Sequence, residues 1–325
     1  MRILSGIRPS GELHIGNYLG AMKNWVELQE EQECVFFVAD LQALTTPYSP
    51  QNLQKNIFET VIAYLAAGIS PEKSIIFVQS HVKEHSELFW LLSTICPVGE
   101  LSRMTQYKEK SRQFKRNINA GLLNYPVLQA ADILLYKPDL IPVGKDQLQH
   151  LELTRSIAKK FNQKFGKVFV EPKPYSPKTG ARIMSLQNPK KKMSKSDDQQ
   201  GYIALFEEPD SIRKKVMAAV TDTGKEIKYN LSKKPGVSNM LTIYSLFANK
   251  SIEEIEKKFQ NKNYSEFKKS LAELIIGSLE DLRRKRKELL TREVYIRDIL
   301  NKGAKRAEII AQSTMDEVRK KMGLV

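Results

Sequence analysis

Short apolar runs alternate with helical patterns over the first 186 residues, and this alternation limits the possible folds more than any other feature of the chain. The apolar runs cover residues 3–7, 35–38, 75–78, 140–144 and 182–186. Such runs are typical of buried strands, and buried strands separated by helices imply a parallel sheet that is covered on both faces. A glycine-bearing turn also follows the first run. The sequence therefore predicts an α/β fold of the doubly wound, Rossmann type.

One helix of this region can be delimited from the sequence. Apolar side chains recur at helical spacing between the second and third runs, at Leu53, Ile57, Val61, Tyr64 and Leu65. Gly68 follows them, and glycine often occupies the left-handed position that ends a helix. We therefore expect this helix to end at Gly68.

Strand-like runs almost vanish after about residue 187. Helical patterns cover residues 212–220, 240–247, 252–259, 267–290 and 294–300. Gly303 then separates a last helix, expected over residues 304–322. A chain of 325 residues is longer than one hydrophobic core usually serves. We therefore predict two domains: a Rossmann-type domain over residues 1–187 and an all-helical domain over residues 188–325, whose last helix could pack back on the first domain.

The chain carries 52 Lys and Arg against 37 Asp and Glu, a formal net charge of +15. Such an excess suggests a polyanionic partner, although it can also serve solubility alone. Two cysteines are too few for a disulfide-stabilised secreted scaffold, and no apolar run reaches the roughly 18–20 residues that cross a bilayer. The first residues also turn polar too soon for a signal peptide. We therefore expect a cytoplasmic protein without a membrane partner.

The turn after the first strand is the first candidate site. It reads Gly-Ile-Arg-Pro-Ser-Gly-Glu-Leu-His-Ile-Gly-Asn from Gly6 to Asn17. Its glycines let the backbone approach a phosphate closely, and the helix that follows offers free N–H groups. His14 and Asn17 could hydrogen-bond phosphate oxygens. The chain has neither the G-x-G-x-x-G fingerprint nor a Walker motif here, and the turn could equally be structural, with His14 capping a helix.

A second candidate segment lies where the α/β part ends. It reads Lys192-Met193-Ser194-Lys195-Ser196. Two lysines and two serines within five residues supply mobile cations and hydroxyl donors that suit a triphosphate. The alternative is a solvated basic linker, which is what most lysine-rich loops are.

Together, the two segments resemble the signatures of the class I aminoacyl-tRNA synthetases. Four stretches between them, in the same order and spacing, resemble the tryptophanyl-tRNA synthetase family of bacterial type. They are Gly99–Ser111, Tyr125–Tyr136, Pro142–Gln147 and Gly180–Ser185. The resemblance extends from residue 2 to about residue 325. It implies an enzyme that activates L-tryptophan with ATP to tryptophanyl-adenylate and pyrophosphate, and then transfers tryptophan to the 3′ end of tRNA(Trp).

The resemblance also implies which residues form the ATP site. They are Arg8, Pro9, Ser10, Gly16, Asn17, Gly144, Lys145, Asp146, Ile183, Lys192, Met193, Ser194, Lys195 and Ser196. The residues 144–146 would face the ribose, and Ile183 the adenine. The catalytic residues would be His14, Asn17, Lys192 and Lys195, with the lysines stabilising charge on the leaving pyrophosphate. ATP would carry Mg²⁺ on its phosphates, so we expect no metal ion ligated by the protein.

Asp132 is the residue that we expect to select the amino acid. The indole N–H is a donor without acceptor capacity, and a carboxylate is a strong acceptor. By its residue type alone, however, Asp132 could be a helix cap or an ion-pair partner. The other expected pocket residues are Tyr125, Gln129, Gln147, Gly6 and Val143. Gln42 stands where a histidine is frequent in the family, and Gln129 where a methionine is common.

Several alternatives remain open. Tyr125-x-x-x-Gln129-x-x-Asp132 also resembles the pocket of the tyrosine enzyme, which makes tyrosine the nearest competing substrate. Outside the class of aminoacyl-tRNA synthetases, the alternatives are a non-catalytic tRNA-binding paralogue and a small-molecule adenylyltransferase. The segment 81–85, His-Val-Lys-Glu-His, fits the H-x-x-E-H pattern of inverted zinc metallopeptidases. It directly follows a strand-like run, however, and a zinc site needs both histidines on one helix face.

Basic residues crowd the longest predicted helix. Arg284 and Arg286 lie in an unbroken basic run over residues 283–287, next to acidic residues that could balance them as a solvated helix face. In the family the helical domain reads the anticodon, so the resemblance implies that Arg284 and Arg286 contact tRNA. The family is homodimeric, and the resemblance therefore also implies a homodimer.

Overall fold

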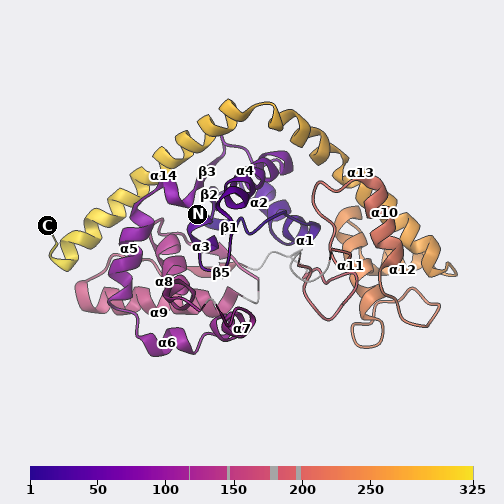
Figure 1. Cartoon of the computed structure of the whole chain (residues 1–325), viewed down its shortest axis with the longest axis horizontal. Helices are drawn as coiled ribbons and strands as arrows, with labels where there is room; N and C mark the ends of the chain where they lie inside the picture. Colours follow the sequence, from indigo (N-terminus) through magenta and orange to yellow (C-terminus); the bar gives the residue numbers. More distant parts are fainter. Residues whose placement is uncertain (117, 145–146, 176–181, 195–198, 325) are drawn as a thin grey trace.

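Figure 1 shows the computed structural model, in which an α/β part and a helical part lie under an arch of two long helices. The structure describes residues 1–324 except 117, 145–146, 176–181 and 195–198. Within these residues, five parallel strands form one sheet in the order β3-β2-β1-β4-β5. They are β1 (Arg2–Ile7), β2 (Glu33–Val38), β3 (Ser74–Val78), β4 (Leu140–Pro142) and β5 (Lys173–Tyr175). The predicted Rossmann-type parallel sheet is confirmed.

Hydrophobic clusters cover both faces of this sheet. Successive side chains of a strand point to opposite faces, so Ile3 and Phe36 join one cluster while Leu4 and Phe37 join the other. The helical elements of the α/β part are α1 (Ile15–Asn17), the π-helical η1 (Tyr18–Met22), α2 (Lys23–Leu28), α3 (Asp40–Ala43), α4 (Pro50–Ala67), the 3₁₀ turn η2 (Gln79–His81), α5 (Glu84–Ser93), α6 (Val98–Ser102), α7 (Thr105–Gln113), α8 (Ala120–Leu134) and α9 (Leu148–Phe165). Helices α2 and α4 pack on the first face, and α5, α8 and α9 on the second.

The predicted end of α4 is confirmed. Gly68 follows Ala67 with a φ of +100°, the left-handed conformation that glycine adopts without strain. Its N–H donates to the carbonyl of Leu65 at 3.1 Å, which closes the last turn of the helix.

The fifth strand is not the one that the sequence predicts. Residues 182–186 form no strand of the sheet, and Met184 makes an isolated antiparallel bridge with Lys192 instead. The apolar side chains of that run pack against the helical part of the chain, which explains their hydrophobicity. The strand at the sheet edge is β5, whose Lys173 and Pro174 are exposed. Proline is tolerated on an edge strand, where one side of the backbone needs no partner, but it weakens the strand signal in the sequence.

The helical part is built on five further helices of the described chain: α10 (Pro209–Ala218), α11 (Pro235–Ala248), α12 (Ile252–Lys258), α13 (Tyr264–Leu290) and α14 (Glu293–Met322). Ser251 and Asn263 begin α12 and α13 with capping boxes, in which their side chains accept hydrogen bonds from the N–H of Glu254 and Glu266. None of the described helices is both long and apolar enough to cross a membrane.

Gly303 lies inside α14, so the predicted break between two helices is wrong. The helix passes directly over β3 at this point, and a Cβ on residue 303 would stand only 1.8 Å from the carbonyl oxygen of Ile76. Glycine is therefore required here for close packing of helix on strand. Farther along α14, Thr314 Oγ1 donates to the carbonyl of Leu135 at 2.8 Å, and Arg319 pairs with Glu87 of α5. The last helix thus packs on the α/β part.

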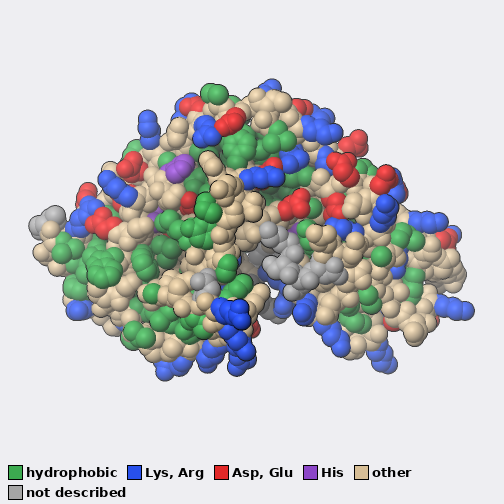
Figure 2. All heavy atoms as spheres, in the orientation of Figure 1, with side chains coloured by type: hydrophobic (Ala, Val, Ile, Leu, Met, Phe, Trp, Pro, Cys, Tyr) green, Lys and Arg blue, Asp and Glu red, His purple; other side chains and the backbone are tan. Residues whose placement is uncertain are grey.

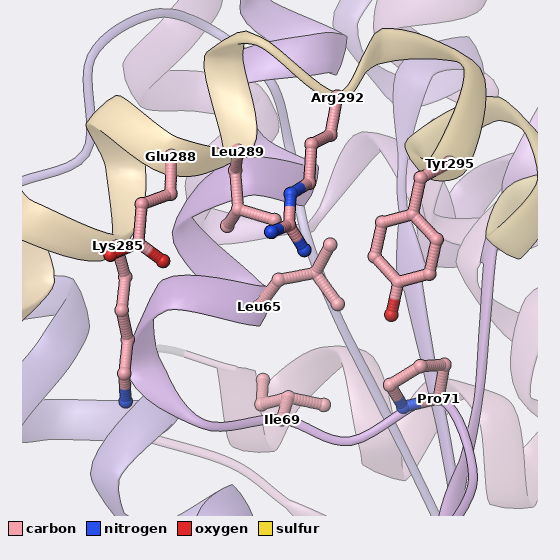
Figure 3. A pocket seen from close by; sticks show the side chains of 8 residues that line it. All are labelled: Leu65, Ile69, Pro71, Lys285, Glu288, Leu289, Arg292 and Tyr295. Carbon is pink, nitrogen blue, oxygen red and sulfur yellow. The ribbon is translucent and has the colours of Figure 1, made fainter.

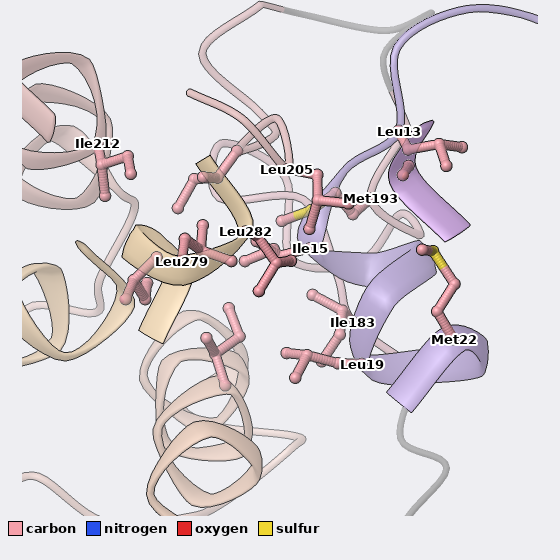
Figure 4. Packing of buried hydrophobic residues seen from close by; sticks show 14 of the residues in the cluster. Leu13, Ile15, Leu19, Met22, Ile183, Met193, Leu205, Ile212, Leu279 and Leu282 are labelled. Atoms are coloured by element: carbon pink, nitrogen blue, oxygen red, sulfur yellow. The ribbon is translucent and has the colours of Figure 1, made fainter. Parts of the chain in front are cut away.

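One hydrophobic cluster joins the two parts of the chain. It contains Ile15 and Leu19 from the start of the chain, Ile183 and Met193 from the connection, and residues of α10, α11 and α13 (Figure 4). The cluster is continuous with the core under one face of the sheet. The helical part is therefore anchored on the α/β part by buried apolar surface as well as by α14.

We expect Gly303→Ala to destabilise the protein, because the added methyl group would force α14 away from the Ile76 carbonyl. Overpacking of this kind costs roughly 1–3 kcal/mol. Gly277→Ala in α13 is the matched control, since nothing lies within 4 Å of its added Cβ. Alanine should stabilise that helix interior by about 0.5–1 kcal/mol. Urea unfolding measures both variants, and equal shifts would contradict a packing role for Gly303.

Candidate active site

The turn between β1 and α1 is held in place by its own side chains. His14 caps α1: its Nδ1 accepts a hydrogen bond from the Gly16 N–H at 3.1 Å. The Asn17 Oδ1 in turn accepts one from the His14 N–H at 3.1 Å. A Cβ on Gly16 would lie 2.9 Å from the His14 ring, so this position has room for glycine alone. His14, Gly16 and Asn17 therefore form one rigid unit.

The His14 imidazole is neutral near pH 7. Burial lowers the pKa of His14 to about 4, with a smaller contribution from the positive charge of Lys192. Because Nδ1 accepts the Gly16 N–H, the neutral ring carries its proton on Nε2. Nε2 can therefore donate a hydrogen bond to an oxygen atom of a ligand.

The Lys192 segment lies against the same turn. The Met193 N–H donates to the carbonyl of Ile183 at 2.9 Å, and both side chains are buried in one cluster with Ile15. The chain that follows also returns to the turn, because Ile15 N–H donates to the carbonyl of Ile203 at 3.0 Å. The structure thus brings the two signature segments together.

Two cations, Lys110 and Arg8, lie near Tyr125. The Lys110 Nζ stands 4.5 Å from the centre of the Tyr125 ring, and Arg8 donates to the hydroxyl of Thr46 at 3.1 Å. Burial, followed by the charge of Arg8, lowers the pKa of Lys110 to about 8. Burial also lowers the pKa of Arg8, with Tyr125 opposing it. Sequence patterns do not single out Lys110, because a lysine within Lys-Glu-Lys is typical of a solvated helix face.

Asp132 is almost fully buried, with 1% of its surface exposed, and it is held by three side chains. Gln79 Nε2 donates to Oδ1 at 2.5 Å, and Gln42 Nε2 donates to Oδ2 at 3.1 Å. His85 Nδ1 lies 2.7 Å from Oδ1, while its Nε2 lies 2.9 Å from the hydroxyl of Tyr136. The structure thus gives Gln42 a place beside Asp132. Gln79 and His85 are missed by the sequence, although both follow the carboxyl end of β3, where sites form in α/β folds.

Three more predicted pocket residues form hydrogen bonds near this carboxylate. Gln129 Nε2 donates to Gln147 Oε1 at 3.2 Å. The Tyr125 hydroxyl lies 2.9 Å from His150 Nε2 and 3.3 Å from Gln106 Oε1. Tyr125 and Gln129 lie on the same helix as Asp132, about two turns and one turn before it respectively.

The remaining predicted residues differ in their exposure. Gly6 is exposed at the end of β1, where a Cβ would lie 2.8 Å from the Phe37 carbonyl oxygen. Pro9 and Ile183 are buried, Val143 and Ser194 are half-buried, and Ser10 and Gly144 are exposed. Lys145, Asp146, Lys195 and Ser196 lie outside the described residues.

The H-x-x-E-H segment does not have the geometry of a zinc site. His81 is exposed in η2, whereas His85 is buried in α5 with both ring nitrogens engaged by Asp132 and Tyr136. Over the part of the chain that the structure describes, no group of three or more His, Cys, Asp or Glu side chains could hold a metal ion. The metallopeptidase alternative therefore has no support in the structure.

The two arginines predicted to contact tRNA lie in different surroundings. Arg284 is 61% exposed and pairs with Asp281 and Glu288 on its own helix. Arg286 is half-buried: it pairs with Glu59 of α4 at 2.8 Å and stacks 5.1 Å from the ring of Phe206. Arg286 therefore helps to fasten α13 to the α/β part.

An open pocket of about 220 Å³ lies between the end of α4 and the corner of α13 and α14 (Figure 3). Its lining residues are Leu65, Ile69, Pro71, Lys285, Glu288, Leu289, Arg292 and Tyr295. None of them belongs to the predicted site, so this pocket is separate from the two signature segments.

The sheet, the capped turn after its first strand and the lysine segment beside that turn all lie in the part of the chain that matches a known family. The family model described as "tRNA synthetases class I (W and Y)" matches residues 1–280. The chain belongs to this family of class I aminoacyl-tRNA synthetases. Within the family, a curated tryptophan–tRNA ligase from Caldanaerobacter subterraneus subsp. tengcongensis is 51% identical over 325 residues, which are 100% of this chain and 98% of the relative. The predicted resemblance to the tryptophanyl-tRNA synthetases is thereby confirmed.

Two solved structures are similar to this chain over almost their whole length. Tryptophanyl-tRNA synthetase from Mycoplasma pneumoniae has a TM-score of 0.93 at 38% identity, covering 100% of this chain and 98% of its own. Tryptophanyl-tRNA synthetase from Campylobacter jejuni, complexed with ADP and tryptophan, has a TM-score of 0.83 at 37% identity, covering 99% of this chain and 100% of its own. The arrangement of sheet and helices is therefore shared with both enzymes.

Proposed function

We propose that this chain is a tryptophan–tRNA ligase, which activates L-tryptophan with ATP and transfers it to the 3′ end of tRNA(Trp). The observation that carries the proposal is the 51% identity, over the full chain, to a ligase of that specificity. Asp132 supports it, because its buried carboxylate can accept a hydrogen bond from an indole N–H.

The reaction needs positioning and charge stabilisation rather than a covalent enzyme intermediate. A carboxylate oxygen of tryptophan attacks the α-phosphorus of ATP, and the bond to the bridging oxygen breaks as pyrophosphate leaves. His14, with its proton on Nε2, and the amide of Asn17 donate to phosphate oxygens. Lys192 and Lys195 stabilise the charge that develops on pyrophosphate. In the second step a ribose hydroxyl of the tRNA attacks the acyl carbonyl, and AMP leaves.

ATP would lie along the turn after β1, between the two signature segments. Arg8, Pro9, Ser10 and Gly16 line this turn, residues 144–146 would face the ribose, and Ile183 the adenine. Magnesium supplies positive charge to the triphosphate and would be held by the phosphate oxygens.

Tyrosine specificity is the nearest alternative, and recognition of the side chain separates the two. A phenol O–H both donates and accepts, whereas an indole N–H only donates. Asp132 acts as an acceptor, since it accepts hydrogen bonds from Gln42 and Gln79. It therefore offers no donor to a phenol oxygen. This arrangement favours the indole.

Exchange of pyrophosphate into ATP, run with tryptophan and tyrosine in parallel, tests the proposal. We expect exchange with tryptophan, and Asp132→Asn should lower kcat/KM for tryptophan roughly 10- to 100-fold, because a charge-assisted hydrogen bond is lost. Asp298→Asn, at an exposed position of α14, is the matched control and should leave exchange unchanged. Exchange with tyrosine alone, or with neither amino acid, would overturn the proposed function.

The surface of α13 and α14 is the proposed tRNA-binding region. Figure 2 shows Lys and Arg side chains interleaved with Asp and Glu along the ridge that these helices form. Arg284 is the better candidate for a phosphate contact, because it is 61% exposed and its carboxylate partners lie on its own helix, whereas Arg286 is half-buried against Glu59 of α4. A tRNA contact of Arg286 would have to share its guanidinium with that carboxylate.

We expect Arg284→Glu to weaken tRNA binding and to make it less dependent on salt. Each phosphate contact contributes about 0.9 to the slope of log affinity against log salt concentration, so the slope should fall by roughly that amount. Lys159→Glu, on α9 outside the proposed region, is the control with the same charge change. Affinity is measured over a series of salt concentrations, and an unchanged affinity and slope for Arg284→Glu would remove this residue from the tRNA surface.

We also propose a homodimer that works in the cytoplasm, where tRNA is charged. Hydrophobic side chains gather on the face formed by α5, α6 and α9 (Figure 2). Trp90 of α5 is 68% exposed and Val98 of α6 is 66% exposed. Large apolar groups left exposed in this way mark surfaces that are covered in an assembly. A solution mass of 37.2 kDa by light scattering, the mass of one chain, would contradict the dimer.

A further inference from the structure

The Asp132 carboxylate ends a buried chain of three polar side chains. Asp132, His85 and Tyr136 are each at most 1% exposed, and they are joined at 2.7 Å and 2.9 Å. The His85 ring is also confined by Phe37 and Phe77, whose ring centres lie 6.0 Å and 5.8 Å away. His85 is therefore shielded from solvent and held between these rings and its two hydrogen-bond partners. Its position is determined by these contacts.

The direction of each hydrogen bond in this chain follows from the chemistry of its ends. An ionised carboxylate can only accept, so His85 Nδ1 carries a proton and donates to Asp132. Burial, and then the negative charges of Asp132 and Glu84, raise the pKa of Tyr136 well above its ordinary value. The phenol therefore keeps its proton and can donate to His85 Nε2. Because the Tyr136 hydroxyl donates to Nε2, it favours the His85 tautomer that carries its proton on Nδ1, the nitrogen that faces Asp132.

The two carboxylate oxygens are then no longer equivalent. Oδ1 accepts from both Gln79 and His85, which uses its two lone pairs. Among the described residues, Oδ2 accepts from Gln42 alone, so one lone pair remains with respect to them. A single donor without acceptor capacity matches this remaining site, and the indole N–H is such a donor.

We infer that His85 and Tyr136 are positioning residues for amino-acid recognition: they hold Oδ1 of Asp132, so that Oδ2 is the atom that accepts the indole N–H. This inference rests on the proposed tryptophan specificity. It assigns a role to the histidine of the H-x-x-E-H segment that needs no metal. Neither residue touches the substrate, and each acts through Asp132.

Two substitutions of His85 separate the donor from the bulk of the ring. An asparagine amide nitrogen is the same number of bonds from Cα as Nδ1, so His85→Asn keeps a donor toward Asp132. His85→Gln moves the amide one carbon farther, toward Tyr136, and removes that donor. Tyr136→Phe keeps the ring and removes only the hydroxyl that donates to Nε2.

Two substrates distinguish positioning of Asp132 from a general structural role. L-tryptophan is compared with 3-(3-benzothienyl)-L-alanine, in which sulfur replaces the indole N–H. For His85→Gln we expect kcat/KM for tryptophan, measured by pyrophosphate exchange, to fall roughly 10- to 100-fold, the effect of a lost charge-assisted hydrogen bond. The sulfur analogue and the KM for ATP should stay within about threefold, because neither uses this acceptor. His85→Asn should retain most of the preference for tryptophan, and Tyr136→Phe should lose part of it.

If the wild-type protein uses tryptophan, an equal loss of kcat/KM for both substrates in His85→Gln, or no change for either, would overturn the inference. A wild-type protein that does not exchange with tryptophan would instead overturn the proposed function. Circular dichroism and thermal unfolding report whether each variant is folded. If His85→Gln does not fold, the ratio of the two substrates in Tyr136→Phe decides: an unchanged ratio contradicts the inference.

Discussion

The hydrophobic cluster that runs from one face of the sheet into the helical part determines where the rest of the candidate site lies. Ile15 and Met193 are buried together in this cluster, with Leu279 and Leu282 of α13 near them (Figure 4). His14 directly precedes Ile15, and Lys192 directly precedes Met193. Burying the two apolar side chains therefore places the two polar ones beside each other at the edge of the cluster. The signature segments lie far apart in the chain, and apolar burial brings them together.

The other face of the sheet meets a different constraint, a carboxylate removed from water. An ionised group at this depth is tolerated only if hydrogen bonds replace its hydration. Gln42 follows β2, and Gln79 and His85 follow β3, so neighbouring parallel strands deliver these partners to the same edge. Asp132 reaches them from α8, which packs on that face. The parallel order of the strands thus explains how residues from three segments meet at one carboxylate.

Local patterns predict much of this architecture, and long-range contacts explain the failures. The first three strands and the end of α4 at Gly68 follow from apolar runs and a glycine, both of which act within a few residues. Gly303 has the same local signal as Gly68, yet it serves packing against Ile76, more than two hundred residues earlier in the chain. The strand β5 is missed because Pro174 weakens its pattern. His85 is missed as a partner of Asp132 because a hydrogen-bond partner leaves no periodic trace in the sequence.

The charges around the turn after β1 show what kind of ligand the site suits. Burial lowers the pKa of Arg8, Lys110 and His14, and in Lys110 and His14 a neighbouring positive charge lowers it further. For Arg8 and Lys110, the shift means that holding a cation there costs the protein free energy, while His14 is neutral near pH 7. A polyanion among these groups would replace this repulsion by attraction, so a triphosphate is the kind of ligand that these charges would favour. The net charge of +15 is therefore not only a property of the open surface: part of it, Arg8 and Lys110, is half-buried near this turn.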